Sequence, residues 1–390
     1  MDRFRYLRPF IEADLKKKMV FLAGPRQVGK TTLAQIILKE SQQGLYYNWD
    51  NKSDRIKLQK NPSWPADISL IVIDELHKYR FWKRWIKGEH DKYHEQFRFL
   101  ITGSARMDIY RKGGDSLQGR YHHYRLHPFS VAELNQYCFK GKCFDPLSFD
   151  KNVSSEIIDT LLKFGGFPES YLTQNEIELR RWQNERLDRL IREDIRDLEN
   201  IRDLSSLELL SEVLISRASQ LLSLNSLRED IEVSHRAISH WMNILERFYY
   251  TFRIYPFIGK TIRSLKKETK LYLWDYSVIE DLGAKFENLV ACHLLKFCHF
   301  LQDTQGYKSR LYYLRDVDKR EVDFLVTINE KPWFAVEAKV SDESSSPALL
   351  YFGQKLKIPY LYQVVLKGTK DVLTGTVRTI PASKFLSHLV

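Results

Sequence analysis

The chain is poor in cysteine and contains no long apolar run. Its 390 residues include four cysteines, and none forms a C-x-x-C pair. A structural zinc site is therefore not expected, and we expect free thiols. No stretch of about 18 or more apolar residues occurs, which argues against a membrane span. The first residues are charged and amphipathic rather than typical of a secretion signal, so we expect a cytoplasmic protein with no membrane partner.

Positive charge is in excess, with a formal net charge of +11. This excess permits an acidic partner such as DNA, but a solvated basic surface without such a partner explains it equally well.

At 390 residues the chain is long enough for two or three domains. No internal repeat or low-complexity tract interrupts it.

Residues 19–129 alternate apolar runs with helix-like segments. The runs 19–23, 70–73 and 99–101 are continuously apolar, as strands buried on both faces are. Residues 31–38 follow the first run as a helix-like segment. This alternation predicts a parallel sheet covered by helices, an α/β fold.

A glycine-rich motif joins the first strand to this helix. Gly24 and Gly29-Lys30-Thr31 fit the pattern G-x-x-x-x-G-K-[ST]. Backbone N–H groups of such a loop close around phosphates, and the helix N-terminus adds positive dipole character. Lys30 would reach the β- and γ-phosphates of ATP, and the Thr31 hydroxyl would bind Mg²⁺. The alternative is a glycine-rich turn with an incidental lysine. The predicted nucleotide-binding residues are Gly24, Pro25, Arg26, Gln27, Val28, Gly29, Lys30, Thr31 and Thr32.

Two carboxylates follow the second apolar run. Asp74 ends a buried strand, where a charge is costly unless it meets a cation. We expect Asp74 to contact the Mg²⁺ of the nucleotide, and Glu75 to orient and deprotonate the attacking water. The alternative is two surface acids at a strand end.

Further candidates for the γ-phosphate follow the third apolar run. Ser104, or Thr102 in its place, is positioned to contact the γ-phosphate or the water, although a plain turn is the alternative. Arg120 precedes the next strand and could sense the γ-phosphate, or be a surface arginine; Arg26 is a weaker candidate.

The motifs occur in a characteristic order. It begins with residues 24–32, continues through Asp74-Glu75, and includes residues 102–104, 117–120 and 126–129. In this order they resemble bacterial and archaeal ATP-binding proteins that join an AAA-type P-loop ATPase domain to a C-terminal domain of uncertain role. The resemblance continues through residues 164–169 and 270–275 and covers nearly the whole chain. AAA-type sites often borrow an arginine from a neighbouring subunit, so Arg120 could act in cis or in trans, and the chain could form a homo-oligomer.

A helix-turn-helix pattern lies in the second half. Residues 227–231 and 235–248 are helix-like, and Ser234 is a plausible N-cap between them. In the resembled family this region has a winged-helix shape. The predicted DNA-binding residues are Arg236 on the second helix, with Lys266 and Lys267 in a basic hairpin. Lys260, Arg263 and Lys270 could also contact phosphates there. A packing or protein-interaction module is the alternative.

Acidic residues recur on a helix and two strands near the C-terminus. Alternation puts Glu321 and Asp323 on one face of a strand, and Glu337 and Lys339 on one face of the next. Gathered carboxylates repel unless they bind a divalent cation, and a nearby lysine could position a water. The arrangement resembles the PD-(D/E)xK nuclease fold. Its metal ligands match Asp323 and Glu337, its catalytic lysine matches Lys339, and its helical acid matches Glu287.

Together the patterns predict four domains. These are an AAA-type P-loop ATPase domain at 1–135, a helical linker at 136–223, a winged-helix-like domain at 224–283 and an α/β restriction-endonuclease-like domain at 284–390. The leading hypothesis is a Mg²⁺-dependent ATPase that controls a DNA-binding half, which could also cleave DNA. One alternative is a nucleotide-dependent switch that binds protein partners through an inactive nuclease-like scaffold. Another is a metal-dependent nuclease that the ATPase regulates.

Overall fold

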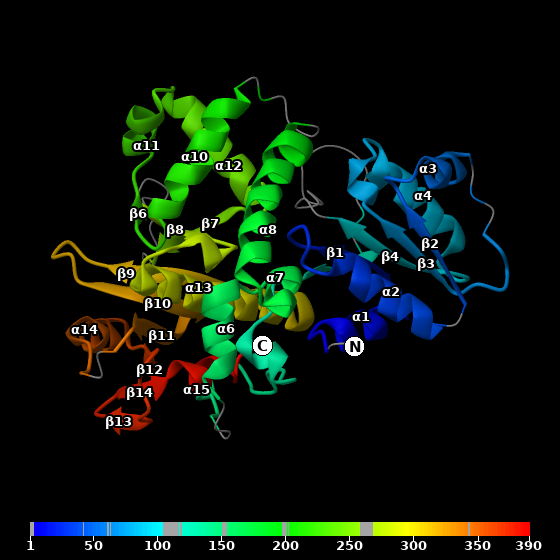
Figure 1. Ribbon diagram of the computed structural model, residues 1–390. Helices are drawn as coiled ribbons and strands as arrows, with labels where there is room; N and C mark the ends of the chain where they lie inside the picture. Colours follow the sequence, from blue (N-terminus) through cyan, green and yellow to red (C-terminus); the bar gives the residue numbers. More distant parts are fainter. Residues whose placement is uncertain are drawn as a thin grey trace. The chain divides into compact units, whose positions relative to one another are not determined.

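The computed structural model describes residues 4–390 except 42, 61, 63, 104–116, 118, 150–153, 197–200, 202, 258–267 and 342–343. The chain divides into two compact units, Met1–Pro128 and Phe129–Val390 (Figure 1). The first boundary lies before the predicted one at 135, because the next residues pack into the second unit. The Phe129 N–H donates to the Gly166 carbonyl at 2.7 Å, and buried Glu133 pairs with Lys296 at 2.6 Å. Residues predicted to form three further domains lie in one compact unit.

Five described strands form the sheet of the first unit, and all their pairings are parallel. The sheet confirms the predicted parallel α/β arrangement, and the three apolar runs lie in its β1, β3 and β4. In sheet order the strands are β2 (Gly44–Asn48), β3 (Leu70–Asp74), β4 (Arg98–Gly103), β1 (Met19–Ala23) and β5 (Tyr121–Arg125).

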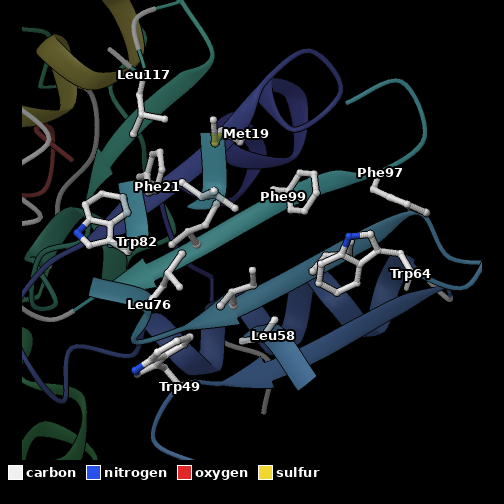
Figure 2. Close-up of a cluster of buried hydrophobic side chains, with 14 of the residues drawn as sticks. Met19, Phe21, Trp49, Leu58, Trp64, Leu76, Trp82, Phe97, Phe99 and Leu117 are labelled. Carbon is white, nitrogen blue, oxygen red and sulfur yellow. The ribbon is translucent and has the colours of Figure 1, made fainter. Parts of the chain in front are cut away.

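Both faces of this sheet are buried, as the continuous apolar runs predicted. Figure 2 shows Met19, Phe21 and Phe99 on one face, with Trp82 packed against Phe21. The opposite face includes Val20 and contacts α2, which buries its apolar side. The helices of this unit are α1 (Arg8–Asp14), α2 (Lys30–Ser41), α3 (Lys52–Gln59), the 3-10 turn η1 (Leu76–Lys78) and α4 (Trp82–Tyr93).

The second unit begins with helices. The helix α6 ends at Phe164, its C-cap Gly165 has a φ of 74° that favours glycine, and Pro168 begins α7. The long helical segment that begins at Glu176 is α-helical as far as Arg189 and then π-helical through Ile195. The elements are α5 (Val131–Leu134), α6 (Glu156–Phe164), α7 (Pro168–Thr173), α8 (Glu176–Arg189), the π-helix η2 (Leu190–Ile195) and α10 (Leu204–Ser216).

A helix pair follows, with short strands on either side. The Ser234 hydroxyl accepts a hydrogen bond from the Ala237 N–H, so it is the N-cap that the sequence predicted. The second helix buries one apolar face through Ile238, Trp241, Met242 and Leu245. The elements are β6 (Leu221–Leu222), α11 (Leu224–Ile231), α12 (His235–Arg247), β7 (Thr251–Pro256) and β8 (Thr269–Leu273).

A mixed sheet organises the rest of the second unit. The described strands lie in the order β13-β14-β12-β11-β10-β9-β7-β8-β6, so the short strands join the C-terminal ones. No helix in the described part of the chain is long and apolar enough to cross a membrane. The remaining elements are η4 (Tyr276–Val278), α13 (Leu282–Gln305), β9 (Ser309–Arg315), β10 (Glu321–Ile328), β11 (Lys331–Lys339), α14 (Pro347–Leu356), β12 (Tyr360–Val365), β13 (Val372–Thr374), β14 (Val377–Pro381) and α15 (Ala382–Leu386).

Candidate functional site

The loop between β1 and α2 requires glycine at both ends of its motif. Gly24 has a φ of 151°, and a Cβ there would stand 2.4 Å from the Leu126 carbonyl oxygen. Gly29 has a φ of 93°, which also favours glycine. The loop therefore keeps its curve, and its close contact with the segment after β5, only because these residues lack side chains.

Lys30 lies at the start of α2 and folds back over this loop. Its ammonium donates to the carbonyls of Gly24 at 3.0 Å and Pro25 at 2.7 Å, and the residue is 5% exposed. A cation thus lies inside the curve of the loop, at the N-terminus of a helix, where the helix dipole is positive. This combination suits the phosphates of a nucleotide.

Asp74 lies at the end of β3 and is 2% exposed. The hydroxyls of Thr31 and Tyr46 each donate to its Oδ2 at 2.7 Å, and the Thr102 hydroxyl donates to Oδ1. These partners are neutral, so the buried carboxylate keeps its affinity for a cation. Carboxylate and hydroxyl oxygens are ligands that Mg²⁺ prefers, and Thr31 and Asp74 lie close enough to face one ion. The donor set therefore fits Mg²⁺.

Glu75 follows Asp74 in an unusual backbone conformation. Its φ of 57° is left-handed, which is costly for a residue with a side chain and typical of functional sites. Its carboxylate Oε2 lies 3.4 Å from Nδ1 of His77, a side chain that is 5% exposed. Burial lowers the pKa of His77, so the imidazole is neutral at neutral pH.

Three residues of this region were missed by the sequence analysis. Arg5 donates to the carbonyls of Val28 at 3.0 Å and His127 at 2.7 Å, so it links the phosphate loop to the segment after β5. Tyr46 reaches Asp74 because β2 pairs with β3. Burial, followed by the Asp74 carboxylate, raises the pKa of Tyr46, so it remains a hydroxyl donor. His77 could have been suspected from its position two residues after Glu75.

Arg120 lies away from the phosphate loop of its own chain. It immediately precedes β5, whose first residue pairs with Met19 at the start of β1, whereas the loop follows the end of β1. A strand rises about 3.3 Å per residue, which separates Arg120 from the loop by roughly 15 Å. Its guanidinium pairs with Asp91 at 2.6 Å. The role in cis was therefore wrong, and a role in trans stays a prediction.

Three other residues, Ser104, Thr102 and Arg26, were predicted as possible contacts of the γ-phosphate. Ser104 lies outside the described residues. Thr102, the alternative to Ser104, is fully buried and bonds to Asp74. A contact between Arg26 and phosphate stays a prediction.

The acidic residues of the C-terminal region gather around a lysine. The Lys270 Nζ lies 3.0 Å from Glu287 Oε1, 2.7 Å from Glu321 Oε1 and 3.1 Å from Asp323 Oδ1. Lys270 is 3% exposed on β8. The expectation that Lys270 contacts DNA phosphates was wrong, because its ammonium is buried among these carboxylates.

Glu337 and Lys339 lie on one face of β11, as strand alternation requires. The Lys339 ammonium pairs with Glu337 Oε1 at 2.8 Å, and the Ala338 N–H donates to Asp323 Oδ2 at 3.0 Å. Burial is the main cause that raises the pKa of Glu337 to about 7 and of Glu287 to about 8. Within the described ranges, no group of three or more acidic, histidine or cysteine side chains is arranged to hold a metal ion. The predicted convergence is therefore present, with Lys270 as an unforeseen cation.

The structure describes some of the residues that were predicted to contact DNA. Arg236 is exposed in the first turn of α12, as a base or phosphate contact requires. Lys266 and Lys267 lie outside the described residues, together with Lys260 and Arg263.

Sequence comparison divides the chain into three matched segments. Residues 16–135 match the model of an AAA domain, residues 155–287 match a domain of unknown function (DUF8612), and residues 282–385 match another (DUF4143). Uncharacterized protein Rv2008c of Mycobacterium tuberculosis is 22% identical over 385 residues, which cover 95% of this chain and 81% of that protein. Uncharacterized protein MJ1544 of Methanocaldococcus jannaschii is 24% identical over 377 residues, which cover 90% of this chain and 82% of that protein.

Structural comparison gives partial likenesses. A Walker-type ATPase of Pyrococcus abyssi aligns with a TM-score of 0.43 and 13% identity, over 70% of this chain and 93% of that one. The RuvB Holliday junction branch migration motor of Thermotoga maritima aligns with a TM-score of 0.31 and 18% identity, over 63% of this chain and 87% of that one. With its parallel sheet, its phosphate loop and its match to the AAA model, the first unit has the fold of an AAA-type P-loop ATPase domain.

Proposed function

We propose that the first unit binds ATP with Mg²⁺ and hydrolyses it. The observation that carries the proposal is the hydrogen bond of 2.7 Å between Thr31 and buried Asp74, beside the Lys30 ammonium. It brings together the two oxygen groups that would hold Mg²⁺, and Thr31 directly follows the lysine that would meet the phosphates. A glycine-rich turn with an incidental lysine would not need a buried carboxylate at this position.

Each residue has a distinct part in the proposed reaction. The loop N–H groups and Lys30 bind the phosphates and offset their negative charge. Thr31 and Asp74 would hold the metal, which would supply positive charge beside the phosphate oxygens. Glu75 accepts the proton of the attacking water, and its left-handed backbone fixes the direction in which the carboxylate leaves the strand. An arginine from a second copy of the chain, with Arg120 as the candidate, would require a homo-oligomer.

Replacement of Lys30 tests ATP hydrolysis. We expect Lys30→Ala to lower ATP turnover by at least about tenfold, because the loop loses the cation that compensates the phosphates. The measurement is phosphate release by the full chain with Mg²⁺, beside Lys39→Ala, a matched control at an exposed position of the same helix. Equal turnover in all three proteins would remove the proposal.

We also propose that the second unit binds DNA through a winged-helix arrangement. The order α10, β6, α11, α12, β7, β8, with β8 paired to both β6 and β7, supports this arrangement. The exposed Arg236 at the start of α12 supports a contact with DNA. Binding of a protein partner by the same face is the alternative.

Salt dependence separates these two partners. If DNA is bound, affinity for a labelled duplex falls steeply between about 50 and 200 mM salt, and Arg236→Ala weakens binding and makes the salt slope shallower by about one unit. Arg181→Ala is the matched control, because this arginine is exposed on α8, outside the helix pair. Absent binding at low salt, or affinity that salt leaves unchanged, would favour the protein partner.

A further inference from the structure

The carboxylates of Glu287, Glu321, Asp323 and Glu337 form the acidic cluster of the second unit. We propose that the ammonium of Lys270 is the resident cation of this cluster, and that the cluster takes up no divalent metal while Lys270 is in place. The proposal is independent of ATP hydrolysis, because its residues all belong to the second unit.

The ammonium group is fully used by the cluster. It has three N–H donors, and three carboxylate oxygens stand within 2.7–3.1 Å of Nζ, one each from Glu287, Glu321 and Asp323. These acids come from α13 and β10, so their convergence depends on the tertiary fold. A surface lysine that happens to lie near one acid would not be coordinated in this way.

Burial makes this cation necessary. Lys270 is 3% exposed and Glu337 is 6% exposed. Carboxylates gathered out of water repel one another unless positive charge lies between them, and an ammonium out of water needs the same compensation. Lys339 pairs with Glu337 and Arg315 pairs with Glu321, so three cations already face four carboxylates. The cluster is therefore nearly balanced by groups of the chain itself.

The remaining oxygens offer little to a metal ion. Glu287 Oε1 also accepts the Tyr272 hydroxyl at 2.7 Å, and Asp323 Oδ2 accepts the Ala338 N–H. Glu337 Oε2 is buried without a hydrogen-bond partner and could serve as one ligand, but one oxygen does not make a metal site. A divalent cation such as Mg²⁺ or Ca²⁺ needs about six oxygen ligands and would also be repelled by the adjacent ammonium. The residues present therefore do not fit a divalent metal while Lys270 occupies the centre.

Lys270 and the acids that surround it come from different parts of the second unit. Lys270 belongs to β8, which pairs with β7 and β6, whereas Glu287 and Asp323 belong to α13 and β10. The Lys270 ammonium thus links β8, through ion pairs, to α13 and β10. The matched segment 282–385 contains the four acids but not this lysine.

Mn²⁺ binding tests the proposal. The full chain is titrated with Mn²⁺ in the absence of nucleotide, and bound metal is followed by electron paramagnetic resonance. We expect wild type to show no Mn²⁺ binding that depends on Asp323, so Asp323→Asn gives the same titration. We expect Lys270→Met to gain one bound Mn²⁺ per chain and to lose it again when Asp323→Asn is added. Lys331→Met is the matched control, because this lysine is exposed at the start of β11.

Two results would overturn the proposal. One is Mn²⁺ binding by wild type that Asp323→Asn abolishes. The other is a Lys270→Met protein that unfolds cooperatively on heating and still binds no Mn²⁺ at the cluster. If Lys270→Met does not fold, wild type and Asp323→Asn decide the matter by themselves. The same pair is incubated with supercoiled plasmid and Mg²⁺, where nicking by wild type that Asp323→Asn removes would also contradict the proposal.

Discussion

Glu75→Gln is expected to lower ATP turnover by about 10²–10⁴-fold while the affinity for Mg²⁺-ATP changes by less than about threefold. Gln keeps the size and the polar character of the side chain, so the left-handed backbone and the neighbouring His77 are undisturbed. It removes only the group that accepts a proton. Turnover is measured as phosphate release, and affinity as displacement of a fluorescent nucleotide.

The control for this substitution is Glu95→Gln, which removes an acid from an exposed position between α4 and β4. It should turn over ATP at the wild-type rate. If Glu75→Gln retained more than about a tenth of wild-type turnover, Glu75 would not be the general base, since positioned bases contribute about 10²-fold or more.

Gly24→Ala is expected to weaken ATP binding by about 100-fold or more, which is about 2.8 kcal/mol. The added Cβ would stand 2.4 Å from the Leu126 carbonyl oxygen, and this atom belongs to backbone that follows β5. The φ of 151° is also unfavourable for alanine. The loop must therefore move, and with it the N–H groups that would surround the phosphates.

Gly88→Ala is the matched control for this substitution. Gly88 lies in α4, and a Cβ there meets no atom within 4 Å. Alanine is the better helix former, so this variant should bind ATP as wild type does and be slightly more stable. Both variants are compared by nucleotide titration and by thermal unfolding. Unchanged affinity in Gly24→Ala would show that the loop does not hold the phosphates.

Local patterns predicted much of the first unit. The strands β1, β3 and β4 follow from apolar runs, because a strand buried on both faces has no polar side. The phosphate loop follows from glycine spacing at a strand-to-helix junction. These features depend on residues close together in the chain, and the structure shows them at the predicted positions.

Long-range contacts were harder to foresee. Tyr46 reaches Asp74 only because β2 lies beside β3, and Lys270 reaches Asp323 only because β8 and β10 share a sheet with α13 against it. Strand order depends on tertiary packing, and no local pattern in this sequence specifies it. Lys270 was consequently grouped with the neighbouring basic residues rather than with distant acids.

The error over Arg120 has a different cause, because the sequence contained the necessary signal. Residues that precede a strand of a parallel sheet lie at the opposite edge from residues that follow one. Arg120 precedes β5, whereas Gly24 and Asp74 lie at the ends of β1 and β3. The strand direction alone therefore separates Arg120 from the phosphate loop of the same chain.

The most direct test of ATP hydrolysis is a single-turnover experiment. Radiolabelled ATP is mixed with an excess of the full chain and Mg²⁺. The reaction is stopped with acid, and the nucleotide is identified by chromatography. We predict ADP from wild type and intact ATP, recovered from the protein, from Glu75→Gln. ADP formed equally fast by both proteins, or intact ATP recovered from both, would contradict the proposal that this chain hydrolyses ATP through Glu75.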